Sequence, residues 1–77
     1  MFEAEQAILD RHREKYPTLK PYRLARMSNN HPTAHVVQQG EDYAACGTKM
    51  YRGFEAPAEG ASSLCDRCRQ YIQQRLA

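Results

Sequence analysis

Apolar residues recur at helical spacing near both ends of the chain, with charged residues at the positions between them. In the N-terminal stretch Pro17 follows this pattern directly, and proline does not continue a helix. The pattern therefore predicts an amphipathic helix over residues 1–17. Its apolar stripe consists of Met1, Ala4, Ile8, Leu9, His12 and Tyr16.

The second helical stretch covers residues 62–77. Ser62 or Ser63 can cap its first turn, because a serine hydroxyl accepts hydrogen bonds from the free N–H groups there. Its stripe consists of Leu64, Cys68, Tyr71, Ile72, Arg75 and Leu76.

Residues that favour strands stand on both sides of Gly40 and Glu41, within the segment 34–54. Glycine at the first position of a two-residue loop suits a type II′ turn, so the sequence predicts a hairpin here. In that register His35 lies opposite Cys46, with both side chains on one face. The residues that follow have the composition of a third short strand.

The segment 18–33 combines a basic composition with Pro21 and a cluster of turn formers. Apolar and basic residues partly alternate over residues 22–26. We therefore predict an irregular basic segment in which these residues could form an edge strand. The elements together predict a small α+β fold. A β-hairpin, with room for a third short strand, lies between an N-terminal and a C-terminal helix.

Composition indicates that such a fold needs more than its apolar core. The 77 residues are 42% hydrophobic and include no tryptophan, and chains this short commonly add disulfides, a metal or a partner subunit. We expect one domain over 1–77. No apolar run approaches the roughly 20 residues that cross a bilayer, and the acidic N-terminal residues are unlike a signal peptide. We therefore expect a cytoplasmic protein without membrane contact.

Three cysteines leave one thiol unpaired in any intrachain scheme, which disfavours a disulfide framework. Three thiolates and one imidazole form a standard closed zinc site instead. Cys65 and Cys68 stand at the start of the predicted helix, where the helix dipole and two flanking arginines favour thiolates. The spacing His35-x10-Cys46-x18-Cys65-x2-Cys68 predicts one Zn²⁺ ion that staples the hairpin to the helix.

Other assignments of these residues are open. His31 could replace His35 as fourth ligand, whereas His12 more commonly would pack in its helix stripe. The cysteines could be buried as small hydrophobic residues, or Cys65 and Cys68 could form a redox dithiol. No βαβ pattern precedes Cys65, which disfavours the redox assignment.

We expect the zinc to be structural, because four protein ligands leave no open position for a reacting water. The deaminase signature H-x-E…P-C-x-x-C is incomplete, since Val37 replaces its glutamate and Leu64 its proline. We predict no catalytic residue, no enzymatic activity and no small-molecule substrate.

The net charge is only +2, but its distribution is uneven. Between residues 11 and 26 six basic residues stand against one acid, with tyrosines interleaved, a pattern that suits phosphate contacts and base stacking. The predicted contacts with nucleic acid or a partner are Arg11, Arg13, Lys15, Lys20, Arg23, Arg26, Tyr16, Tyr22, Arg67, Arg69 and Arg75.

These features predict a module that binds nucleic acid or a transcription complex. One alternative is an adaptor or inhibitor of a larger machine, which would use the first helix and the tyrosines Tyr16, Tyr22, Tyr43 and Tyr51. Another is that the charges only solvate helix faces.

The pattern H-V…C-G…C-x-x-C is represented here by His35-Val36, Cys46-Gly47 and the pair Cys65 and Cys68. It resembles the shared pattern of a loose group of small zinc-binding proteins of actinobacteria and their phages. The resemblance spans roughly residues 34–71 and implies metal binding by the quoted residues. Most members of the group have no assigned activity, so the resemblance implies nothing about a partner.

Overall fold

The computed structural model describes residues 2–51 and 53–77. Helix α1 spans Glu3–Lys15, and α2 spans Asp66–Tyr71 and continues as a π-helical turn, η2, over Ile72–Leu76. Met1 and Arg52, which fall in the predicted helix and the predicted sheet segment, lie outside the described residues. Within the described part of the chain, no helix has the length and apolar character that a membrane crossing requires.

One sheet joins four short strands. They are β1 (Tyr22–Arg26), β2 (Thr33–Gln38), β3 (Ala56–Pro57) and β4 (Ser63–Leu64), and the turn η1 (Ala58–Gly60) follows β3. Their order is β3-β1-β2-β4. β1 is antiparallel to both β2 and β3, whereas β4 runs parallel to β2. The predicted class is confirmed: a small α+β fold with a hairpin and a helix toward each end.

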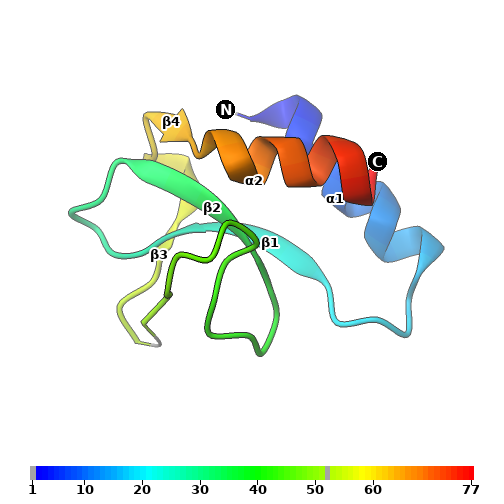
Figure 1. Ribbon diagram of the computed structural model, residues 1–77, viewed down its shortest axis with the longest axis horizontal. Helices are drawn as coiled ribbons and strands as arrows, with labels where there is room; N and C mark the ends of the chain where they lie inside the picture. Colours follow the sequence, from blue (N-terminus) through cyan, green and yellow to red (C-terminus); the bar gives the residue numbers. More distant parts are fainter. Residues whose placement is uncertain (1, 52) are drawn as a thin grey trace.

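The helices lie side by side along one side of the strands, and the segment after β2 lies on the other side (Figure 1). Tyr22 of β1 points to the helical side, where its ring contacts His12 of α1 and Tyr71 of α2. Residues of a strand alternate between faces. Because Val36 lies on the same face as Tyr22 in the β1–β2 register, His35 and Val37 point to the opposite face.

The core connects helices, sheet and loop. Val36 of β2, Cys68 of α2 and Ile72 are fully inaccessible to solvent. The core therefore anchors β2 and α2, which both carry residues of the predicted metal site. The largest cluster of buried residues consists of Leu9, Ala25, Val36, Val37, Ala44, Met50, Cys68, Ile72 and Leu76.

The partner of β2 differs from the predicted one. Val37 lies opposite Arg23 of β1 rather than opposite Ala44, and residues 22–26 form a central strand instead of an irregular or edge segment. Pro21 stands just before this strand, so it removes no N–H group from the ladder. The longer pairing with β1 therefore replaces the predicted hairpin.

The turn after β2 begins one residue earlier than predicted. The N–H of Glu41 donates to the carbonyl oxygen of Gln38 at 3.0 Å, and Gly40 has a φ of 87°, which glycine adopts readily. The chain then closes on itself, with an isolated bridge between Tyr43 and Lys49. This contact stands in place of the predicted third strand after Gly47.

The C-terminal helix begins later than predicted. Ser63 and Leu64 belong to β4, and Cys65 precedes α2 without a side-chain cap. The Ser63 hydroxyl lies 3.1 Å from that of Thr33 instead of capping the helix. Pairing with β2 keeps this segment extended, so the helix starts at Asp66.

Candidate metal centre

Four side chains converge where β2, the loop after it and the start of α2 meet. They are His35, Cys46, Cys65 and Cys68, the set that the spacing predicts. Their ligand atoms all lie within 4.8 Å of one another; Cys68 is buried and the other three are partly buried. The four side chains are therefore positioned to bind one metal ion.

Two backbone hydrogen bonds bring the ligand segments to one edge of β2. The carbonyl oxygen of Ala34 accepts from the N–H of Cys65 at 2.9 Å, and that of Val36 accepts from Ala45, also at 2.9 Å. Carbonyls two residues apart on a strand face the same neighbour. His35 therefore lies between the start of α2 and the loop residue that precedes Cys46.

The positions of nitrogen and sulfur match tetrahedral coordination. Nδ1 of His35 lies 3.4 Å from Sγ of Cys46 and 3.8 Å from Sγ of Cys68. Zinc bonds of ordinary length separate a nitrogen and a sulfur ligand in a tetrahedron by about 3.6 Å. Nδ1 is thus the nitrogen that faces the candidate ion.

Burial and hydrogen bonding act on the ligands in different directions. Burial raises the pKa of the Cys68 thiol to about 12, and it lowers the pKa of the His35 imidazole. At Cys46 burial also acts to raise the pKa, but hydrogen bonds from Thr48 and the other thiols outweigh it and leave the pKa below its ordinary value. The Thr48 hydroxyl lies 3.1 Å from the Cys46 sulfur.

These shifts describe a site that suits a cation. The lowered pKa of His35 favours the neutral imidazole and the lowered pKa of Cys46 favours the thiolate, whereas the raised pKa of Cys68 means that its proton must be displaced by an incoming ion. Thr48 is a residue that sequence reasoning missed. The available signal was a hydroxyl residue two positions after a predicted cysteine ligand.

The other two histidines point elsewhere. Nδ1 of His31 lies 2.7 Å from the Ser28 hydroxyl, within the loop before β2. The ring of His12 packs near those of Tyr16 and Tyr22, with centroids 4.9 and 5.6 Å away. The structure thus groups His35, and neither alternative, with the thiols.

The basic residues of the predicted contact surface are divided by the fold. Arg26 is only 9% exposed, and its guanidinium donates to three backbone carbonyls, one in β3 and two in the loop between β1 and β2. Arg23 pairs with Glu55, and Arg69 with Glu5. Arg23 is nonetheless exposed, and so are Arg11, Arg13, Lys15, Lys20, Arg67 and Arg75.

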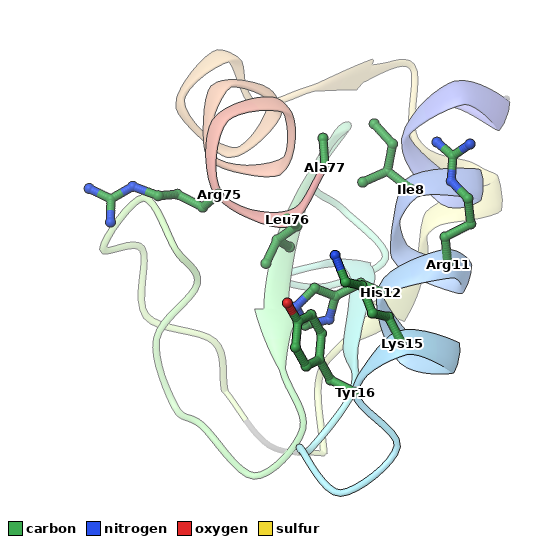
Figure 2. A pocket seen from close by; sticks show the side chains of 8 residues that line it. All are labelled: Ile8, Arg11, His12, Lys15, Tyr16, Arg75, Leu76 and Ala77. Carbon is green, nitrogen blue, oxygen red and sulfur yellow. The ribbon is translucent and has the colours of Figure 1, made fainter.

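Some of these exposed residues line a cavity between α1 and the C-terminal turn (Figure 2). Arg11, Lys15 and Tyr16 line it from the α1 side, and Arg75 lines it from η2. Tyr22, predicted to share this surface, is partly buried, and its hydroxyl lies 3.1 Å from that of Tyr71.

No protein-family model matches this chain, and no curated protein or solved structure is significantly similar to it. The interpretation of the candidate centre therefore depends on the residues themselves.

Proposed function

We propose that the chain is a non-catalytic module built around one structural zinc ion, bound by His35, Cys46, Cys65 and Cys68. The observation that supports this most directly is the convergence of their ligand atoms within 4.8 Å. Thiolates and imidazole favour zinc, whereas magnesium and calcium prefer oxygen ligands. Four protein ligands complete the tetrahedron, so no position is left for a reacting water.

The ion would also stabilise the fold. It would join β2, the following loop and α2, and its binding free energy would become part of the folding free energy. This accounts for a small chain whose core is built from few large apolar side chains.

Native mass spectrometry of protein prepared without chelator tests the zinc proposal. We expect a mass increase of one zinc ion, lost together with the folded state in Cys68→Ser and in His35→Ala. His31→Ala is the matched control and should keep the ion. Replacement by Co²⁺ should give the intense visible bands of tetrahedral thiolate coordination. A folded protein of metal-free mass would contradict the proposal, and a Cys65–Cys68 disulfide in that protein would favour the redox alternative.

We further propose that the zinc-bound fold presents a cationic surface to nucleic acid, either free in the cytoplasm or within a transcription complex. The support is the cavity that Arg11, Lys15 and Arg75 line together with Tyr16. Arg75 follows α2 in the chain, and α2 starts between two of the proposed zinc ligands. The ion would thereby fix the position of Arg75 relative to α1.

Titration of labelled DNA and RNA across a salt series tests this role. Affinity should fall steeply as salt rises, because each phosphate contact releases condensed counterions. Protein treated with chelator should bind more weakly than zinc-loaded protein. Absent binding at about 50 mM salt, or binding that ignores salt, would contradict the role.

A second candidate function, a protein adaptor, is favoured by aromatic residues in and after the loop that follows β2. Tyr43, Tyr51 and Phe54 are 58%, 52% and 70% exposed, and exposed aromatic side chains are common anchors in protein interfaces. Affinity purification with and without nuclease separates the two functions. Proteins that stay bound after nuclease treatment would support the adaptor, and their loss would support the nucleic-acid role.

A further inference from the structure

The cavity between α1 and η2 combines three kinds of surface. It has a volume of about 260 Å³, and among the described residues no aspartate or glutamate side chain lines it. Figure 2 shows the side chains of Lys15 and Tyr16 close together, with the guanidinium groups of Arg11 and Arg75 toward opposite sides. Ile8, Leu76 and Ala77 form its apolar part, and His12 and Tyr16, whose ring centroids are 4.9 Å apart, form its aromatic part. Its cationic part consists of Arg11, Lys15 and Arg75.

The spacing of the cations follows from the helix. Arg11 and Lys15 are four residues apart in α1 and so lie on the same face, one turn from each other. The acidic residues Asp10 and Glu14 of the same helix are absent from the cavity lining. Two positive groups can therefore face one anion without a competing aspartate or glutamate side chain, although Ala77, the last residue of the given chain, also lines the cavity.

An aromatic ring lies next to these cations. Tyr16 is 42% exposed, and Nζ of Lys15 is 5.5 Å from the centre of its ring. A nucleotide presents the same pair of features in complementary form, a flat base and a phosphate joined through a sugar. Bases stack on exposed aromatic side chains while nearby cations bind the backbone.

The size of the cavity restricts what can enter it. Pockets for drug-sized ligands run from roughly 300 to 1,000 Å³, so this cavity of about 260 Å³ suits one small unit rather than a base pair. A base in a duplex is stacked and paired on both strands, and extruding it costs a few kcal/mol. A single strand supplies an unpaired base without that cost.

We propose that this cavity receives one unpaired nucleotide of a single strand. Its base lies against Tyr16, its phosphate lies between Arg11 and Lys15, and the adjoining phosphate approaches Arg75. This proposal depends on the proposed nucleic-acid function and gives it a substrate class, single strands in preference to duplexes.

Fluorescence anisotropy of zinc-loaded protein with labelled oligothymidylate, oligouridylate and a mixed-sequence duplex tests the proposal. We expect tighter binding to both single strands than to the duplex. Tyr16→Ala should weaken single-strand binding about tenfold, as expected for one lost stacking contact, whereas Tyr16→Phe should keep the affinity. Tyr43→Ala removes an exposed tyrosine elsewhere and should have no effect.

The charge contribution has its own matched control. Arg13 is also exposed and also lies in the last turn of α1, but it does not line the cavity. Arg11→Ala and Lys15→Ala should each weaken single-strand binding several-fold more than Arg13→Ala. Zinc content and circular dichroism should match the wild type in every variant, because these side chains are exposed.

The outcomes separate this proposal from the broader function. Single-strand binding that is equally weakened by Arg13→Ala and Lys15→Ala, or that is matched by the duplex, would overturn the cavity proposal alone. If the wild type binds no nucleic acid at low salt, the nucleic-acid function itself fails.

Discussion

The carbonyl oxygen of Val36 accepts a hydrogen bond from the N–H of Ala45 at 2.9 Å. This contact brings the loop back to β2 directly before Cys46, whose sulfur then lies 3.4 Å from Nδ1 of His35. Residues on the way from β2 to Ala45 belong to no strand. Placement of this ligand therefore depends on a few local groups, and small changes in the loop should alter metal affinity before they alter the core.

Thr48 is the first of these groups. Its hydroxyl lies 3.1 Å from the Cys46 sulfur and stabilises the thiolate. We predict that Thr48→Val lowers zinc affinity about tenfold, at the lower end of the 10–100-fold range for lost ligand-supporting hydrogen bonds. Competition with a chromophoric chelator measures this. Thr48→Ser should restore affinity, and Thr33→Val, which removes a hydroxyl away from the thiols, should leave it unchanged; equal loss in both valine variants would contradict the assignment.

Gly47, directly after Cys46, is the second residue on which the placement of Cys46 depends. Its φ is 92°, and among the described residues no atom beyond its two chain neighbours lies within 4 Å of where a Cβ would stand, so a side chain there meets backbone strain but no obstruction. We predict that Gly47→Ala destabilises the zinc-loaded protein by about 1–2 kcal/mol in denaturant unfolding. Gly47→Asn should cost less, because asparagine tolerates the left-handed region better. An alanine variant as stable as the wild type would show that this backbone conformation is not required.

Arg26 and Gly60 form a structural pair remote from the thiols. A Cβ at position 60 would lie 2.7 Å from Cζ of Arg26, whose guanidinium is held by backbone carbonyls. We predict that Gly60→Ala destabilises the fold by about 1–3 kcal/mol, as expected for overpacking. In an Arg26→Ala background the same change should cost much less. Additive effects in this double-mutant cycle, measured by denaturant unfolding, would refute the clash.

The raised pKa of Tyr22 predicts how the stability of the fold responds to alkaline pH. Burial, then the hydrogen bond with Tyr71, raises its pKa from 10.0 to about 12. Between these values the unfolded chain loses a proton that the folded protein keeps, so stability present below pH 10 falls as pH rises toward 12. Site-resolved NMR of the tyrosine rings measures the titration.

Matched variants identify the source of that alkaline effect. Tyr71→Phe removes the hydrogen bond, so the pKa of Tyr22 should move back toward 10.0. Tyr43→Phe changes an exposed ring and should leave the transition as it is. If Tyr22 titrates in step with the exposed tyrosines of the native protein, the packing described for it is wrong.

The helices and the proximity of Cys65 to Cys68 could be predicted because both depend on short-range spacing. The apolar stripe around Ile72 indicates a helix wherever it packs, and Cys65 and Cys68 share a helical turn in any fold that begins a helix there. The predicted hairpin favoured His35 over His31 as the fourth ligand because it placed His35 opposite Cys46. The structure also brings His35 and Cys46 together, but through the loop after β2 instead of a hairpin.

Strand partners could not be predicted in the same way. β2 has apolar residues on both faces, so β1 and the segment after Gly40 are both plausible neighbours, and the choice depends on the whole sheet. The strands β3 and β4 have two residues each, too few for an alternating pattern to be recognised in the sequence. The burial of Arg26 could not be predicted either. Arginine is usually a surface residue, and the backbone carbonyls that accept hydrogen bonds from Arg26 come together only in the folded chain.

The shortness of β3 and β4 has a consequence for association between copies. They are the outer strands of the sheet and contain two residues each, so each edge offers few free N–H and C=O groups. Strand addition by another chain needs a longer row of such groups. The two outer strands themselves therefore offer little backbone for polymerisation through β-pairing.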